Sequence, residues 1–352
     1  MKNNEWLIYG AYGYTGKLIV QEAVKRGHKP ILAGRSGEKL KLMSDSLGLR
    51  MAVVGLNDKD ALRKLLSEVK LVFNAAGPFV HTSEPIIQAC LEAGTNYMDI
   101  TGEIPVFQKT FSYDEKAKER GIVLMSGVGF DVVPTDCMAR YVSDHVMEAK
   151  ELELAFSGLG NPSAGTFKTI LNVLPEGGFI RRNGKLTPYT LGRGTKKIKF
   201  INKTYTAMPI PWGDLETAYR STGIPNITTY MVYPDYAVPI IRYGTPLIKG
   251  IIKMNMIKVL SRKLVDRFIS GPDERMLNEG HSYVWAMAKN EKGERKEAWL
   301  DTVEGYRFTA IAGVLGIEKV FQLKLKGALT PAMAFGADFV LEVKGTKRYD
   351  HL

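Results

Sequence analysis

Over its first 130 residues the chain alternates short apolar segments with helical ones, a pattern that few folds accommodate. The predicted strands are residues 6–10, 30–34, 50–56, 71–76, 97–101 and 122–126. The helical segments between them are residues 15–26, 38–47, 58–68, about 84–93, and a longer stretch that ends at Arg120. Strands that are apolar throughout and are separated by helices form parallel sheets covered on both faces. Because such crossovers are right-handed, the pattern predicts a doubly wound α/β fold.

A glycine-rich turn follows the first predicted strand. Its sequence, Gly-Ala-Tyr-Gly-Tyr-Thr-Gly over residues 10–16, is a G-x-x-G-x-x-G variant of the dinucleotide-binding loop. Glycines let the backbone approach a pyrophosphate, and the helix that follows offers N–H groups and a partial positive charge. We predict that the loop binds a dinucleotide through Gly10, Tyr12, Gly13, Tyr14, Thr15 and Gly16.

The end of the second strand indicates which dinucleotide is bound. Enzymes that use NAD usually carry an acidic residue there, which holds the ribose 2′-hydroxyl. This chain has Arg35 and Ser36 instead, and the next acidic residue is Glu38. A guanidinium pairs bidentately with a 2′-phosphate and a serine adds a hydrogen bond, so we predict NADP(H) as the cofactor. The alternative is that Arg35 only forms a salt bridge with a surface carboxylate.

The loops after the later strands contain the candidates for contact with the reacting groups. The loop after the fourth strand is predicted to lie against the nicotinamide half of the cofactor through Ala76, Gly77 and Pro78. Candidates for proton transfer or substrate contact are His81, Glu103 and Asp131, one after each of three successive strands. Each also has a plainer interpretation, as an exposed loop histidine for His81 and as a helix cap for the two carboxylates. Asp99 and Asp136 are expected to have structural roles.

The net charge of the 352-residue chain is +11, and two windows in the second half are basic without a single acid. Residues 177–213 contain eight basic residues and residues 236–265 contain six. No helix-turn-helix, zinc-finger spacing or RNP-type strand accompanies them, so nucleic acid is not an expected partner. The first window is explained equally well by a basic surface that contacts only solvent and by a surface with a function. In the second, the charges alternate with apolar residues, which suits a surface helix on a partner subunit or on an anionic membrane.

Several chemistries lack their motifs in this sequence. The chain contains no H-E-x-x-H, C-x-x-C or G-x-S-x-G, and no tyrosine is followed four residues later by lysine. Metal-dependent hydrolysis, serine esterase chemistry and the Tyr-x-x-x-Lys acid of short-chain dehydrogenases are therefore not expected, and no metal site is predicted. The chain has two cysteines and no signal-peptide pattern at residues 1–5, so we expect a cytoplasmic protein, with membrane association through residues 236–265 left open.

These motifs together resemble the NADP-binding domain of saccharopine dehydrogenase-like oxidoreductases, a group that includes the trans-acting enoyl reductases. The resemblance is carried by residues 10–16, 33–35, 77–79, 99–103 and 129–136, and residues 330–336 resemble the closing element of the family. It implies a Rossmann-type doubly wound parallel sheet, with a second α+β domain inserted before a C-terminal return to the first. We expect an NADP-binding domain of residues 1–134 and 305–352, and a substrate and dimerisation domain of residues 135–304.

Two functions follow from this resemblance and from the residues. The first is an NADP(H)-dependent oxidoreductase that reduces an acyl or lipid-like substrate, either a small molecule or a carrier-bound acyl group. The basic windows favour an anionic or carrier-bound substrate through electrostatic steering. The alternative is an NADP-binding sensor or membrane-peripheral protein without turnover, which the lack of a recognisable proton donor supports. The resemblance also implies a homodimer, with its contact in the second domain.

Overall fold

The computed structural model describes most of the chain. The described residues are 4–157, 177–239, 241–242 and 271–352. Contacts group the chain into two units, and each unit has its own sheet. The first unit comprises Met1–Val133 and Tyr306–Phe335, and the second comprises Pro134–Gly305 and Gly336–Leu352.

The place of the C-terminal tail differs from the prediction. Residues 305–352 were expected to return to the first unit, but only Tyr306–Phe335 belong to it. The last residues join the second unit because β16 (Lys347–Tyr349) pairs antiparallel with β14 (Arg295–Val303). The return to the first unit is therefore made by two helices and a short strand, and not by the whole tail.

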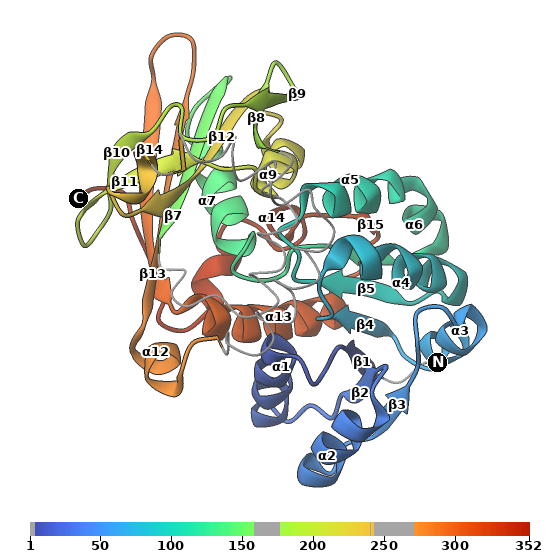
Figure 1. Cartoon of the computed structure of the whole chain (residues 1–352). Coiled ribbons are helices and arrows are strands. Elements are labelled where there is room, and N and C mark those ends of the chain that lie inside the picture. Colours follow the sequence, from blue (N-terminus) through green and yellow to red (C-terminus); the bar gives the residue numbers. More distant parts are fainter. Residues whose placement is uncertain (1–3, 158–176, 240, 243–270) are drawn as a thin grey trace. The chain divides into compact units, whose positions relative to one another are not determined.

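The first unit contains a seven-stranded sheet in the order β15-β6-β5-β4-β1-β2-β3, and every neighbouring pair is parallel (Figure 1). The strands are β1 (Trp6–Tyr9), β2 (Ile31–Gly34), β3 (Met51–Val53), β4 (Leu71–Asn74), β5 (Asn96–Asp99), β6 (Val123–Met125) and β15 (Gly327–Ala328). All six predicted strands are present, and the strand order reverses between β1 and β4. The doubly wound α/β fold is therefore confirmed.

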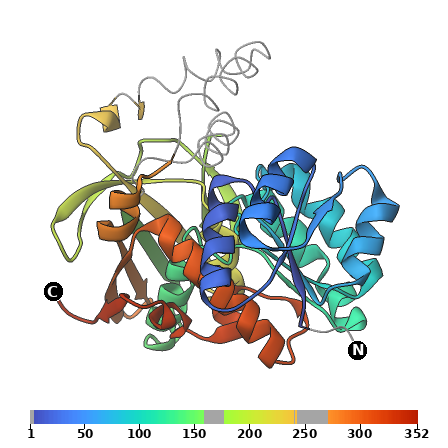
Figure 2. The same cartoon turned by 90° about the horizontal axis from the view of Figure 1, so that it is seen from below.

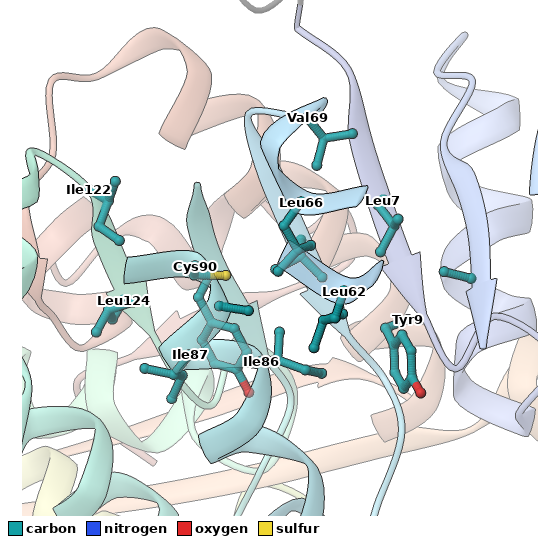
Figure 3. Packing of buried hydrophobic residues seen from close by; sticks show 14 of the residues in the cluster. Leu7, Tyr9, Leu62, Leu66, Val69, Ile86, Ile87, Cys90, Ile122 and Leu124 are labelled. Carbon is teal, nitrogen blue, oxygen red and sulfur yellow. The ribbon is translucent and has the colours of Figure 1, made fainter. Parts of the chain in front are cut away.

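Helices cover both faces of this sheet. They are α1 (Tyr14–Lys25), α2 (Gly37–Leu47), α3 (Lys59–Ser67), α4 (Phe79–Ala93), α5 (Ile104–Ser112), α6 (Asp114–Arg120), α13 (Gly305–Gln322) and α14 (Pro331–Phe335). The long helical stretch predicted before Arg120 is two helices, which meet at Tyr113. Figure 3 shows Leu62 of α3 and Ile86 of α4 gathered beside Tyr9 of β1 in a buried apolar cluster.

On the other face, α1 and α13 run side by side (Figure 2). The Tyr14 ring meets the Tyr306 ring edge to face, with their centroids 5.1 Å apart, near the start of both helices. Toward the other end, Nη2 of Arg26 lies 2.6 Å from Oε2 of Glu318. The glycine at position 313 of α13 sits against Phe73 of β4, so this helix covers the central strands. The start of α13 is thereby held next to the start of α1.

Helix α4 begins five residues earlier than the sequence predicts, at Phe79 instead of Glu84. The early start places Pro85 inside the helix, although proline lacks an N–H and is disfavoured there. The N–H groups of Phe79 and Val80 are satisfied by the carboxylate of Glu103, which lies far along the chain. His81 is consequently an exposed residue in the first turn of a helix, and its predicted place in a loop is wrong.

The second unit contains a mixed nine-stranded sheet, which confirms a second α+β domain (Figure 1). Its strands besides β14 and β16 are β7 (Glu151–Ser157), β8 (Gly178–Arg182), β9 (Lys185–Tyr189), β10 (Lys196–Lys199), β11 (Thr204–Pro209), β12 (Asn226–Tyr233) and β13 (His281–Lys289). The helices that the structure describes in this unit are α7 (Val133–Asp144), α9 (Asp214–Thr222) and α12 (Glu274–Glu279), with a 3-10 turn η2 (Phe339–Glu342). Asp136 of α7 is buried and accepts a hydrogen bond from Oγ of Ser221 at 2.6 Å, a structural role.

Ion pairs neutralise part of the first basic window inside this unit. Arg181 is buried and lies 2.9 Å from the carboxylate of Glu216, and Lys196 pairs with Glu153. Most of the second window lies outside the described residues, which omit 240 and 243–270. Among the helices that the structure describes, none has the length and apolar character needed to cross a membrane.

Candidate cofactor and active site

The glycine turn lies at the carboxyl end of β1, where the strand order reverses. The N–H of Gly10 donates to the carbonyl of Ala33 at 2.8 Å, which joins the turn to β2. Gly10 has φ +86°, and a Cβ there would lie 2.8 Å from the Cβ of Ala76. A Cβ at Gly16 would collide with the carbonyl oxygen of Gly10. Neither position has room for a side chain, so the backbone itself lines this edge of the sheet.

The N-terminus of α1 has the features of an anion-binding site. Gly13 precedes the helix in an extended conformation, no side chain caps the helix through a hydrogen bond, and its first turn contains no acid. The first N–H groups of a helix carry partial positive charge and bind phosphate readily. The geometry of this turn therefore fits the pyrophosphate of a dinucleotide.

Basic and aromatic groups surround the end of β2. A Cβ on Gly34 would lie 2.7 Å from Cε1 of Tyr12, so this ring packs directly on the strand end. The Nζ of Lys39 lies 5.7 Å from the centroid of the same ring. Arg35 is exposed, and in the described part of the chain no carboxylate pairs with it. Ser36 precedes α2 without capping it through its hydroxyl. Arg35 and Lys39 thus place two cations where a 2′-phosphate is predicted, and the sequence reasoning missed Lys39.

The loop after β4 is held rigidly beside Gly10. The side-chain oxygen of Asn74 accepts a hydrogen bond from the N–H of Ala76 at 3.0 Å, and Oγ1 of Thr82 donates to the Ala76 carbonyl at 2.7 Å. The Gly77–Pro78 peptide bond is cis. Ala76 therefore lies against Gly10 of the glycine turn, and Gly77 and Pro78 follow it in the same loop. Contact of this loop with the cofactor stays a prediction.

Glu103 caps a helix, but not the one that follows it. Its two carboxylate oxygens accept hydrogen bonds from the N–H of Phe79 at 3.0 Å and from the N–H of Val80 at 2.8 Å. Both N–H groups belong to the first turn of α4, and only 4% of Glu103 is exposed. A carboxylate at this position stabilises the positive end of the helix. The geometry thus favours the capping interpretation of Glu103 over a role in proton transfer.

The pKa of Asp131 lies in the range that suits proton transfer near neutral pH. Burial, together with the negative charge of Glu103, raises the pKa of Asp131 to about 7. A carboxyl group with this pKa holds a proton for part of the time at neutral pH and can exchange it. The loop before Asp131 is fixed by α13, because Oγ1 of Thr309 accepts a hydrogen bond from the N–H of Phe130 at 2.9 Å. Thr309 lies so far along the sequence that no local pattern indicates this contact.

The chain is similar to known proteins over this region and beyond it. Residues 6–125 match the family model described as the saccharopine dehydrogenase NADP binding domain. The chain is 32% identical over 161 residues to the saccharopine dehydrogenase-like oxidoreductase of Mus musculus, a match that covers 40% of this chain and 37% of the mouse protein. It is 24% identical over 404 aligned positions to the trans-acting enoyl reductase of Mycobacterium tuberculosis, which covers 96% of this chain and 95% of that protein.

A solved structure shares the fold. The apo saccharopine dehydrogenase (L-Glu forming) of Saccharomyces cerevisiae superposes with a TM-score of 0.66 and 12% identity, over 99% of this chain and 100% of that chain. At this identity the likeness concerns the fold alone. The predicted resemblance is confirmed by these similarities. The family model that matches residues 6–125 is one of NADP-binding domains, in agreement with the predicted cofactor.

Proposed function

We propose that this chain, whose residues 6–125 belong to the saccharopine dehydrogenase family of NADP-binding domains, is an oxidoreductase that reduces an acyl or lipid-like substrate by hydride transfer. The observation that carries this proposal is the close-packed site at the strand-order reversal, where Gly10 lies against Ala76 and α1 starts without a side-chain cap. This site, formed by the glycine turn and the Ala76 loop, is called the cradle below. The similarity to a trans-acting enoyl reductase over nearly the whole chain supports an acyl substrate, with a carrier-bound form included.

Different residues of the first unit bind the cofactor and hold the proton in such a reaction. The glycine turn and the start of α1 bind the pyrophosphate, and Arg35 with Lys39 binds the 2′-phosphate. When bound, NADPH supplies the hydride. Asp131 holds the proton that the substrate must also receive, and Glu103 keeps that proton in place near neutral pH through its own negative charge. The roles of Ala76 to Pro78 are to support the cofactor from the neighbouring loop and to exclude water from it.

Exchange of the charge at Arg35 tests the cofactor site. A guanidinium hydrogen-bonded to a phosphate contributes more than a neutral pair, so Arg35→Glu should weaken NADPH binding by about tenfold or more and leave NADH binding nearly unchanged. Arg63→Glu is the matched control, because Arg63 is an exposed arginine on α3 whose ion pair among the described residues is with Asp60. Fluorescence titration of both nucleotides measures the effect. Equal NADPH affinity in wild type and Arg35→Glu would show that the phosphate assignment is wrong.

Turnover distinguishes an enzyme from a sensor. Wild-type protein is expected to oxidise NADPH when an enoyl thioester is added, and Asp131→Asn should reduce the rate at saturating NADPH without preventing NADPH binding. Tight NADPH binding with no oxidation by enoyl thioesters or by imine acceptors would favour the alternative function, a sensor that binds NADP without turnover.

The homodimer, the cytoplasmic location and the membrane contact stay predictions. Residues 236–265 are the segment predicted to touch an anionic membrane. Flotation with anionic liposomes tests this contact, with a variant in which the six basic residues of the segment are neutralised as the control. Equal flotation of both proteins would exclude the segment as the membrane anchor.

A further inference from the structure

A single buried carboxylate lies at the centre of the strand-end loops. Asp99 ends β5 and is fully buried. Its Oδ1 accepts hydrogen bonds from the N–H of Thr101 at 3.0 Å and from the N–H of Gly127 at 2.9 Å. Its Oδ2 accepts from the hydroxyls of Tyr97 and Ser126, both at 2.8 Å. One side chain thus joins the end of β5 to the loop after β6.

The same network continues to the loop after β4. The hydroxyl of Tyr97, which donates to Asp99, accepts a hydrogen bond from Nδ2 of Asn74 at 3.2 Å. The oxygen of the Asn74 amide then accepts from the N–H of Ala76 at 3.0 Å. Because the Tyr97 hydroxyl donates its proton to a carboxylate, its oxygen can only accept the hydrogen bond that the amide nitrogen of Asn74 donates. This fixes which end of that amide faces Ala76.

In the other direction the network reaches the loop of Glu103. The N–H of Thr101 is held by Asp99, and the Thr101 hydroxyl oxygen accepts from the N–H of Glu103 at 3.0 Å. The Glu103 carboxylate in turn caps α4. The backbone carbonyl of Asp99 accepts from the N–H of Val128 at 2.7 Å, in the loop that leads to Asp131.

An ionised carboxylate buried without a cation is costly unless hydrogen bonds replace its water. Four donors do so here, and three loops are tied to them. We propose, on the basis of the function proposed above, that Asp99 is a positioning residue: it holds the loops of Ala76, Glu103 and Asp131 in the geometry that hydride and proton transfer require. It acts through its neighbours and does not itself touch the substrate.

Removal of one hydroxyl from the network tests this role. Tyr97→Phe keeps the ring in the buried cluster but breaks the connection between Asp99 and Asn74. We expect NADPH affinity to fall by about tenfold, with a further decrease in kcat, because the Ala76 loop and the proton donor are no longer held together. Amide hydrogen exchange at Ala76 should accelerate in the same variant.

Thr95→Val is the matched control. Thr95 precedes β5, and its buried hydroxyl donates to the carbonyls of Leu66 and Val69, at the end of the strand opposite Asp99. Thr95→Val should lower the midpoint of urea unfolding about as much as Tyr97→Phe does, and it should leave NADPH affinity and kcat unchanged. If Tyr97→Phe does not fold, Asn74→Ala breaks the same connection nearer the cofactor loop and has the same expected result.

The outcomes separate the two proposals. If the wild type binds NADPH, and Tyr97→Phe and Thr95→Val have the same NADPH affinity and the same kcat, the positioning role is wrong. The proposed function would be intact in that case. Absence of NADPH binding by wild type would overturn the proposed function and this inference with it. A selective loss in Tyr97→Phe, or in Asn74→Ala, supports both.

Discussion

Two glycines with nearly the same positive φ have different surroundings, and this difference allows a quantitative test of the close-packed glycine turn. Gly10 has φ +86° and Gly27 has φ +85°, so both lie at a positive φ that strains an alanine. A Cβ at Gly27, after α1, meets nothing within 4 Å. A Cβ at Gly10 would lie 2.8 Å from Cβ of Ala76 and 2.9 Å from its Cα and its backbone nitrogen. Only the second substitution forces two loops apart.

The expected magnitudes follow from these contacts. Left-handed backbone costs an alanine about 1–2 kcal/mol relative to glycine, which is the whole effect expected for Gly27→Ala. Overpacking adds about 1–3 kcal/mol, so Gly10→Ala should lower the free energy of unfolding by about 2–5 kcal/mol. Gly10→Ala should also abolish measurable NADPH binding, because the two loops of the cradle separate, whereas Gly27→Ala should leave it unchanged.

Urea denaturation and NADPH titration measure both quantities on the same proteins. The double variant Gly10→Ala with Ala76→Gly should recover only part of the loss, because the Cα and nitrogen of residue 76 remain in the way. Equal losses of stability in Gly10→Ala and Gly27→Ala, or normal NADPH binding by Gly10→Ala, would refute the assignment of this turn as a close-packed cradle.

Three further predictions concern charged side chains. Burial and Glu103 raise the pKa of Asp131 to about 7, so its contribution to stability is complete below about pH 4 and is lost as the pH rises through 7. Urea unfolding between pH 4 and pH 8 should show this fall, and a wild-type slope retained in Asp131→Asn would contradict it. Glu103→Gln should lower the pKa of Asp131, as measured by carboxyl NMR, and weaken the cap of α4 by about 1 kcal/mol; an unchanged pKa would show that the two carboxylates do not interact. Asp58→Ala removes the cap of α3 and should cost about 1 kcal/mol in urea unfolding, whereas Asp60→Ala, which removes an exposed ion pair with Arg63, should cost less. Equal losses would mean that the cap contributes nothing.

The parts of the fold that local patterns determine are the parts that the sequence predicts. Apolar strands and helical periodicity over the first 130 residues locate all six strands, and the glycines of residues 10–16 locate the cofactor turn. These features depend on neighbours within one element, where spacing and residue type are sufficient. The strand β15 has only two residues, too few for any periodicity, so its addition to the sheet is not visible in the sequence.

Features that depend on distant residues were missed. The start of α4 is set by Glu103, so neither the early start nor the helical position of His81 follows from the residues near them. Glu103 was considered as a group for proton transfer or substrate contact, or as a helix cap, and the helix that it caps is the preceding one, α4. The raised pKa of Asp131 requires burial and a neighbouring charge, and both are properties of the folded unit. The last residues of the chain were assigned to the first unit because the pairing of β16 with β14 has no local signature in the sequence.

The late arrival of β15 has a consequence for synthesis on the ribosome. Strand β6 ends at Met125, and its partner at Gly327 and Ala328 emerges only after the whole second sheet up to β14 has been made. At about 5–20 residues per second, the outer edge of β6 waits roughly 10–40 s for that partner. An open edge of this kind pairs readily with other extended chains. A nascent or prematurely terminated polypeptide should therefore depend on chaperones that shield β6, and the finished protein should not.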